Sequence, residues 1–311
     1  MHSSEWTDLA RPAQLPVNVW RVGDVVAQKA GQIAAALPLV RLEDGRLAAD
    51  AVAEYRGQLE RVAGLNDLAA TLRQALRSER GARGYVVIDG LIGPDPPRGE
   101  DLRLPTAVCA LAGTPFRVVD RWDLWQELGV DLDAVPYRFG GVGYNPFHVD
   151  LVNATRLPDL FCLFSVRCDP AGGGQTILSN LQDAVARLGQ DEIDQLRQPV
   201  FCEGRFFGMS GVGEELNPFP VLEALPGDLW RVRFTAKMLP EMPDNDLKRL
   251  LQRFQQVLIQ SQECFMLRPG QMLIVNQLLL AHGRLALGAG QERIPAGRRR
   301  YLRQTYMHAG M

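Results

Sequence analysis

Two histidines and one aspartate of this chain have the types and spacing of metal ligands. His148 and Asp150 form an H-x-D motif, and His282 follows a long apolar segment, residues 272–281. Alternate side chains of a strand point to one face, so we expect His148 and Asp150 to lie side by side. His282 is expected where a buried strand meets a turn, from which it could supply a third ligand. Two imidazoles and one carboxylate on one face of an octahedron suit iron(II), because three adjacent positions stay open.

Other interpretations of the same residues have to be weighed. An H-x-D motif also arises by chance, and a histidine at a strand end is commonly a structural residue. Zinc hydrolases use similar ligands, but their helical H-E-x-x-H pattern is absent. A second feature is the basic segment that ends at Arg300, directly before an apolar segment. A planar guanidinium can bind a carboxylate through two parallel hydrogen bonds, which a lysine cannot reproduce.

The elements that must position these residues follow from the hydrophobic pattern. Residues 22–80 are rich in helix formers, and apolar residues recur there at three- and four-residue spacing, which predicts a helical preface. From residue 84 onward, short β-rich segments alternate with Gly, Pro and Asn, and one helical insert is expected at residues 245–262. The predicted strands cover residues 116–119, 147–152, 160–167, 175–179, 230–234, 272–276 and 301–306.

This order of elements predicts an α+β fold. Its core would be a double-stranded β-helix, or jelly roll, rather than a series of alternating βαβ units. We expect a single domain over residues 1–311, in which the preface packs on the outer face of a jelly-roll catalytic core at residues 84–306.

The overall composition restricts the possible partners and the compartment. The chain has 311 residues, with 34 Lys and Arg against 36 Asp and Glu, so its net charge of −2 gives no general attraction for nucleic acid or an anionic membrane. Five scattered cysteines without a C-x-x-C pair favour a reducing, cytoplasmic location. No signal peptide or membrane-spanning segment is predicted.

Taken together, the motifs resemble those of the taurine dioxygenase and clavaminate synthase-like family of iron(II)- and 2-oxoglutarate-dependent oxygenases. The resemblance covers about residues 84–306. It rests on the H-x-D motif, a strand at residues 160–167, the glycine-rich turn 172–174 that leads to Thr176, the sequence Ala-His-Gly-Arg at residues 281–284, and an arginine before Tyr-Leu at residues 300–302.

The resemblance implies that His148, Asp150 and His282 bind iron(II), and that Arg300 and Thr176 bind the cosubstrate 2-oxoglutarate. It further implies that 2-oxoglutarate and O2 are converted to succinate and CO2 while a substrate is hydroxylated. Since the third ligand is a carboxylate, the chlorinating members of the family, which lack it, are disfavoured. Thr176 could instead be a turn residue at the start of a strand.

The roles of three further positions also have to be considered. The loop at residues 285–297 is longer than is common in the family, so Arg298, which shares strand parity with Arg300, is the alternative cosubstrate ligand. Arg284 is expected to be a surface residue or a structural salt-bridge partner. Asn276, in the strand before the distal histidine, is expected to be structural.

The substrate is expected to be a small amino-acid-like molecule. Candidate contacts are residues 140–145, the polar loop 206–217 with its Glu214-Glu215 pair, and Arg231 or Arg233. Desaturation or ring closure of a specialised metabolite, free or tethered to a carrier protein, stays open as variant chemistry. A jelly-roll protein that only binds a ligand or metal is the alternative from another class, and the sequence does not indicate an oligomeric state.

Overall fold

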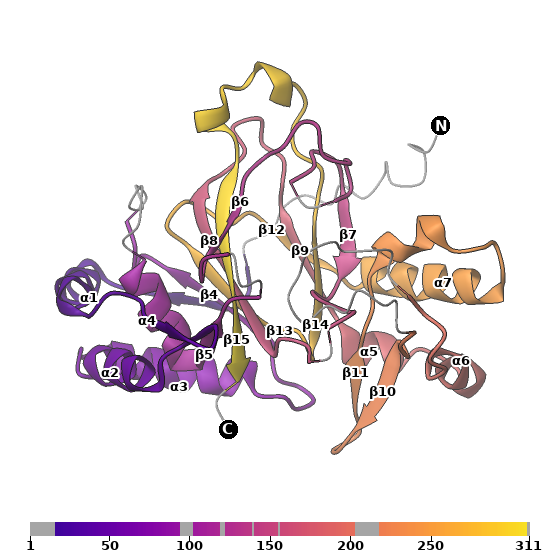
Figure 1. Ribbon diagram of the computed structural model, residues 1–311, viewed down its shortest axis with the longest axis horizontal. Coiled ribbons are helices and arrows are strands. Elements are labelled where there is room, and N and C mark those ends of the chain that lie inside the picture. The colour runs from indigo at the N-terminus through magenta and orange to yellow at the C-terminus, as the bar shows by residue number, and fades with distance from the viewer. Residues whose placement is uncertain are drawn as a thin grey trace.

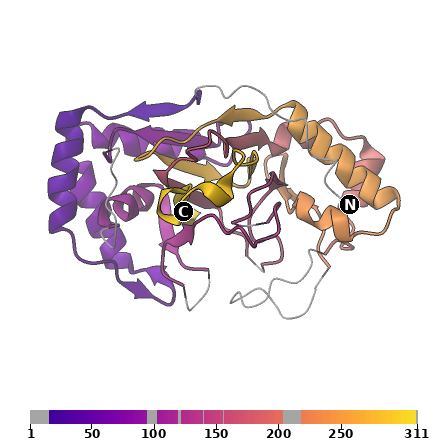
Figure 2. The same cartoon turned by 90° about the horizontal axis from the view of Figure 1, so that it is seen from above.

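The computed structural model describes residues 16–93, 102–118, 122–138, 140–154, 156–202 and 218–309. Two β-sheets face each other in the middle of the molecule, and helices cover the outer face of each sheet (Figure 1). Seen from above, the N-terminal helices and the later helices lie at opposite ends of the molecule (Figure 2). The architecture is α+β, which confirms the fold class predicted from the sequence.

The larger sheet contains two strands that are buried on both faces. Its strands are β1 (Val19–Arg21), β2 (Leu42–Glu43), β3 (Arg46–Leu47), β4 (Tyr85–Asp89), β5 (Gly113–Phe116), β6 (Gln126–Leu128), β8 (Leu160–Arg167), β13 (Met272–Asn276) and β15 (Tyr301–Ala309). Within the described ranges their order is β1-β4-β13-β8-β15-β5-β3-β2, with β6 paired to β15. The central strands β8 and β13 are apolar on both faces because both faces of the sheet are covered.

The smaller sheet carries the two histidines of the predicted triad. Its strands are β7 (Asn145–His148), β9 (Thr176–Asn180), β12 (Glu263–Phe265) and β14 (Leu280–Arg284), in the order β12-β9-β14-β7. Each pair of neighbouring strands in this sheet is antiparallel. A separate antiparallel hairpin is formed by β10 (Leu222–Leu225) and β11 (Leu229–Val232).

Alternating side chains of the larger sheet connect it to two different layers. In β4, Val86 and Ile88 join the cluster formed with the N-terminal helices, whereas Tyr85 and Val87 join the cluster between the two sheets. The helices of the first cluster are α1 (Asp24–Ala36), α2 (Ala49–Glu60), α3 (Leu65–Leu76) and α4 (Arg103–Ala112). Asn276 ties this layer to the sheet, because its Nδ2 donates a hydrogen bond of 2.7 Å to the carbonyl oxygen of Leu76. Its role is structural, as predicted.

The outer face of the smaller sheet is covered by later helices. Ile177 of β9 and Ala281 of β14 pack in one cluster with Phe254. The covering helices are α5 (Leu181–Val185), α6 (Gln190–Leu196) and α7 (Asp246–Gln260), and three 3-10 helices, η1 (Ala236–Glu241), η2 (Gln291–Arg293) and η3 (Ala296–Arg298), lie in connections. None of the helices in the described ranges combines the length and the apolar character needed to cross a lipid bilayer.

The predicted elements differ from the observed ones mainly where turns intervene. The strands predicted at residues 160–167 and 272–276 are confirmed with the same bounds, as β8 and β13. The strand predicted at residues 147–152 is wrong in its second half, because β7 ends at His148. The apolar segment 272–281 is divided by a turn between β13 and β14, so His282 lies in the middle of a strand rather than at its end.

Candidate active site

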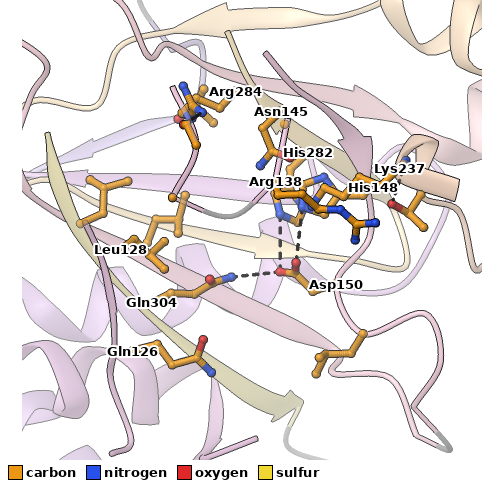
Figure 3. Close-up of a pocket in the computed structure, with 18 of the residues that line it drawn as sticks. Gln126, Leu128, Arg138, Asn145, His148, Asp150, Lys237, His282, Arg284 and Gln304 are labelled. Carbon is orange, nitrogen blue, oxygen red and sulfur yellow. Dashed lines mark hydrogen bonds and ion pairs between the residues drawn. The ribbon is translucent and has the colours of Figure 1, made fainter. Parts of the chain in front are cut away.

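The three predicted metal ligands come together at the edge of the smaller sheet. His148 of β7 and His282 of β14 are paired across the antiparallel ladder, with ring centroids 4.2 Å apart. The Oδ1 of Asp150 lies 3.5 Å from the Nε2 of His148, and its Oδ2 lies 3.4 Å from the Nε2 of His282. One ligand atom from each residue lies within 4.8 Å of the other two. The structure therefore brings the triad together (Figure 3).

A turn, and not strand parity, aims Asp150 at the histidines. The backbone N–H of Asp150 donates a hydrogen bond of 2.7 Å to the Oε1 of Gln277, so it takes no part in a strand ladder. The next residue, Leu151, has a φ of 60°, and the N–H of Ala154 donates to its carbonyl oxygen at 2.8 Å. The left-handed conformation is uncommon for leucine and turns the chain sharply after the carboxylate.

Neighbouring groups fix the orientation of the triad. The Nδ1 of His148 donates to the carbonyl oxygen of Pro146 at 2.8 Å, which leaves the lone pair on Nε2 directed at the site. The Nε2 of Gln304 donates to the Oδ2 of Asp150 at 2.9 Å. The ring of Phe161 packs against His282, with centroids 4.3 Å apart. These contacts fix the orientation of the three side chains.

The donor set fits a divalent transition metal. Two Nε2 atoms and a carboxylate converge, and separations of 3.4 and 3.5 Å are those of ligand atoms that each lie roughly 2 Å from one shared ion. The Nδ1 of His282 is buried and has no hydrogen-bond partner among the described residues, whereas its Nε2 faces Asp150. Imidazole and carboxylate ligands of this kind suit iron(II).

Electrostatics keep the triad ready to bind a cation at neutral pH. Burial, followed by the charge of Lys237, lowers the pKa of His148, and burial together with the neighbouring cations lowers the pKa of His282 to about 3. Burial alone would raise the pKa of Asp150, but the charges of His282, His148 and Lys237 lower it below its usual value. Both imidazoles are therefore neutral and the carboxylate is ionised at neutral pH, which is the protonation state of a metal site.

The iron-free protein should lose stability as the pH falls below 6.5, the ordinary pKa of histidine. The unfolded chain then takes up protons that folded His282 does not accept until about pH 3, so the free energy of unfolding should fall by about 1.4 kcal/mol per pH unit for this residue. Urea denaturation at pH 7 and pH 5.5 measures the decline. The variant His282→Gln should show a shallower decline, and an equal decline in both proteins would contradict the assignment.

The triad lines a cavity of about 330 Å³ between the two sheets. The smaller sheet contributes residues of β7, β9 and β14, and the larger sheet contributes residues of β6, β8 and β15. Figure 3 shows Gln126, Leu128 and Gln304 on one side of Asp150, and the histidine pair above it. A small substrate and a cosubstrate could share a cavity of this size and position.

Arg300 and Thr176, the predicted cosubstrate ligands, line the same cavity. Thr176 begins β9 and is 3% exposed, and Arg300 directly precedes β15. Burial and the nearby charge of Arg284 lower the pKa of Arg300 to about 9, so the guanidinium stays protonated at neutral pH and a bound carboxylate would offset both effects. The alternative, Arg298, ends η3, is exposed and does not line the cavity. The geometry favours Arg300.

The long loop after β14 is anchored on the glycine-rich turn through Asp169. Its Oδ2 accepts hydrogen bonds from the N–H groups of Gly288 at 2.6 Å and Gly173 at 3.1 Å. Its Oδ1 accepts one from the side chain of Gln291 at 2.8 Å. The two segments approach so closely that a Cβ at Gly173 would lie 2.2 Å from the backbone nitrogen of Gly288. The added length of this loop is thus absorbed by a specific contact next to Arg300.

Gly174 lets the glycine-rich turn touch Arg300, so its replacement should affect the cosubstrate. A Cβ there would lie 3.0 Å from the Cδ of Arg300 and 2.8 Å from the Cδ2 of Leu287. We expect Gly174→Ala to raise the Kd for 2-oxoglutarate about tenfold while leaving the affinity for iron(II) unchanged. Gly172→Ala is the matched control, since Gly172 has the same left-handed backbone, with φ of +83° against +79°, and no atom within 4 Å of its Cβ position. Equal effects of the two changes on the Kd would contradict this role.

Three arginines have roles other than those predicted, and one predicted loop cannot be placed. Arg284 is buried, and its guanidinium donates to the carbonyl oxygens of Gly141 at 2.6 Å and Gly143 at 2.8 Å, so the prediction of a surface residue or salt-bridge partner is wrong and it anchors the glycine loop instead. Arg233 donates hydrogen bonds to Glu223 and to the carbonyl oxygens of Val152 and Ala154, and it does not line the cavity. Arg231 also pairs with Glu223. The polar loop 206–217, with its two glutamates, lies outside the described residues.

Several functional residues were not found from the sequence. Asp169, Gln277 and Gln304 support the site through contacts between segments distant in the chain, for which the local sequence holds no signal. Lys237 lines the cavity and is only 8% exposed. Its signal was present in the sequence, because it is one of only three lysines and lies in an otherwise apolar segment.

Comparison with solved structures identifies similar folds. An asparagine oxygenase in complex with Fe(II), 2S,3S-3-hydroxyasparagine and succinate is similar over 93% of each chain, with a TM-score of 0.73 and 20% sequence identity. The non-heme iron oxygenase OrfP in complex with Fe and α-ketoglutaric acid is similar over 94% of each chain, with a TM-score of 0.70 and 17% identity. OrfP with Fe and L-Arg gives a TM-score of 0.66 and 18% identity over 95% of each chain. At these identities the likeness establishes the fold.

Comparison of sequences gives the family. No curated protein sequence matches the chain. Residues 45–306, however, match the family described as taurine catabolism dioxygenase TauD, TfdA family. The match includes the triad, the glycine-rich turn and Arg300, and it covers most of the chain. The chain therefore belongs to the TauD/TfdA dioxygenase family, as its motifs predict.

Proposed function

We propose that this chain is an iron(II)- and 2-oxoglutarate-dependent oxygenase that hydroxylates a small amino-acid-like metabolite. The observation that carries the proposal is a His-Asp-His triad that shares one cavity with the guanidinium of Arg300. Family membership supports the reaction class. The similar solved structures hold iron together with hydroxyasparagine or arginine, which supports an amino-acid-like substrate.

Each predicted site residue has a definite role in this proposal. His148, Asp150 and His282 would bind iron(II) through two Nε2 atoms and one carboxylate. Arg300 would bind the far carboxylate of 2-oxoglutarate through two hydrogen bonds, with the hydroxyl of Thr176 beside it. Bound iron(II), with 2-oxoglutarate and O2, supplies the oxidising power that converts R–H to R–OH and releases succinate and CO2.

The chain itself contributes binding, orientation and exclusion of water. The cavity lies between two sheets whose facing side chains are largely apolar, so hydrogen bonds to a bound carboxylate are stronger there than in water. Gln304 and Pro146 hold the metal ligands in one orientation. Gln277 fixes the turn that carries Asp150. Such preorganisation limits the rearrangement needed when metal and cosubstrate bind.

The proposal extends to the fold and the compartment. The facing antiparallel strands β7, β14, β9 and β8, β13, β15 support a double-stranded β-helix, or jelly roll, as the core of one catalytic domain. The helical preface would act as its structural support, because its helices α1, α2 and α3 share a core cluster with the larger sheet. The five cysteines are all free, which supports a reducing compartment such as the cytoplasm.

Anaerobic titration with iron(II) and then 2-oxoglutarate tests the proposal. The expected result is a weak visible absorption band, typical of a 2-oxo acid that binds iron(II) through two oxygens, with one iron and one 2-oxoglutarate per chain. Succinate itself, which lacks the keto group, is the matched control and should give no band. If metal is bound and 2-oxoglutarate gives no band, the oxygenase proposal fails, and a protein that only binds a ligand or metal becomes the better account.

A further inference from the structure

One wall of the cavity is formed by two paired strands of the larger sheet. Leu302 and Gln304 of β15 line the cavity, and so do Leu128 and Gln126 of β6. The register pairs Leu302 with Leu128 and Gln304 with Gln126, and side chains that are directly opposite in this way have Cβ atoms about 5 Å apart. The wall is therefore apolar at the step nearest to Arg300, and two carboxamides line it at the next step.

The orientation of the Gln304 carboxamide is fixed by the chemistry of its neighbour. The Nε2 of Gln304 lies 2.9 Å from the Oδ2 of Asp150. A carboxylate that binds a metal is ionised and can only accept hydrogen bonds, so the amide nitrogen has to face Asp150 and the amide oxygen has to point elsewhere. Gln304 lines the cavity and is only 6% exposed. Its oxygen is therefore directed to a hydrogen-bond donor inside the cavity.

The two carboxamides lie in a part of the cavity that the cosubstrate does not need. Under the proposed function, 2-oxoglutarate extends from Arg300 to the metal site. Gln304 is four positions beyond Arg300, which is roughly 13 Å along an extended strand. Figure 3 shows Gln126 and Gln304 together on one side of Asp150, away from the histidine pair. The space beside these two side chains is thus next to the metal and open to the substrate.

We propose that Gln126 and Gln304 form a hydrogen-bonding subsite that selects substrates with an uncharged carboxamide, that is, asparagine, glutamine and similar amides. This inference rests on the proposed oxygenase function and names the substrate class of the same site. The N–H of a substrate amide would donate to the Oε1 of Gln304, and its carbonyl oxygen would accept from the Nε2 of Gln126. Both hydrogen bonds would form in a largely apolar cavity, where they contribute more than in water.

A carboxylate fits the same place poorly. It has no proton to donate to the Oε1 of Gln304, and it would bring a negative charge next to Asp150. The cations of the cavity lining are engaged within the protein, because Arg284 donates to backbone carbonyl oxygens, and Arg138 and Lys237 each have an interaction partner. They therefore give no reason to expect a second carboxylate on the substrate.

Pairs of amino acids with equal shape test the inference. L-asparagine is compared with L-aspartate, and L-glutamine with L-glutamate. Each is titrated anaerobically into the protein that holds iron(II) and 2-oxoglutarate, and binding is followed by calorimetry and by the change of the visible band. At least one amide should bind about tenfold more tightly than its acid, because a buried hydrogen-bonding group that loses its partner costs free energy of this order.

Substitutions assign the preference to the subsite. Gln126→Met keeps the length of the side chain and removes its hydrogen-bonding groups, so it should weaken amide binding about tenfold, leave acid binding within about twofold and leave 2-oxoglutarate binding unchanged. Gln304→Met should also remove the preference, and it should weaken iron(II) binding about tenfold because Asp150 loses its donor. Gln74→Met, at an exposed position of α3, is the control with the same chemical change.

The inference and the proposed function can fail separately. The inference is overturned, while the function stands, if the visible band forms and the acids bind as tightly as the amides, or if neither amide binds at millimolar concentration. It is also overturned if Gln126→Met weakens acids and amides equally, since this is the result expected of a structural glutamine. If no band forms, the proposed function fails first and the inference fails with it.

Discussion

Replacing Asp150 by asparagine is expected to weaken iron(II) binding by more than about 100-fold and to abolish substrate hydroxylation. Loss of a residue that only orients a metal ligand typically costs 10–100-fold in metal affinity, so loss of the charged ligand itself should cost more. Asparagine has nearly the same shape and can still accept the hydrogen bond that Gln304 donates. The loss should therefore reflect the charge. Equilibrium dialysis under anaerobic conditions measures the Kd for iron(II).

A control separates this effect from a general loss of structure. Asp67→Asn makes the same chemical change at an exposed position of α3 and should leave the Kd for iron(II) unchanged. Circular dichroism should show the same secondary structure in both variants. An Asp150→Asn protein that binds iron(II) as tightly as the wild type would show that this carboxylate is not a ligand, and the metal site would have to be sought elsewhere.

The second large effect is expected at Arg300. Arg300→Ala should raise the Kd for 2-oxoglutarate about 100-fold, because the truncation leaves a carboxylate in a largely buried cavity without its partner. Arg300→Lys should recover only part of this loss, since an ammonium cannot form two parallel hydrogen bonds to one carboxylate. Iron(II) binding should stay unchanged in both variants. The visible band, titrated with 2-oxoglutarate, measures the Kd.

Arg298 provides the matched control for the register of this segment. It is two residues away, carries the same charge and is exposed at the end of η3. Arg298→Ala should bind 2-oxoglutarate like the wild type. If Arg298→Ala loses affinity and Arg300→Ala keeps it, the cosubstrate lies in another orientation and Arg298 is the ligand.

The local hydrophobic pattern was sufficient to predict the bounds of strands whose two faces are both apolar. Strands β8 and β13 have the predicted bounds because a continuous apolar segment ends where polar residues or a turn begin. It was not sufficient for α4, whose residues at positions 103–112 are nearly all apolar and therefore show no clear period. It also missed the hairpin of β2 and β3, whose strands are only two residues long.

For the site, residue type was a better guide than local conformation. His148 and Asp150 do lie together, but a hydrogen bond from the Asp150 backbone to Gln277 and the left-handed Leu151 bring this about, not the period of a strand. The supporting residues Asp169 and Gln304 act on segments more than a hundred positions away. No local sequence pattern contains such pairings, which arise only when the two sheets face each other.

The positive charge that lines the cavity could have been suspected from the sequence, but it was not predicted. Counting lysines shows that Lys237 is unusual, yet only the fold places it beside the triad and on the same side as Arg138. A net charge of −2 for the whole chain conceals this local excess of cations.

The measurement that tests the central claim most directly is a crystal structure of the protein grown without oxygen in the presence of iron(II) and 2-oxoglutarate. Data collected on both sides of the iron absorption edge locate the metal independently of the protein coordinates. We expect one iron, bound by His148, Asp150 and His282, with a 2-oxoglutarate whose far carboxylate meets Arg300. Iron at another place, or a cosubstrate that does not reach Arg300, would contradict the account.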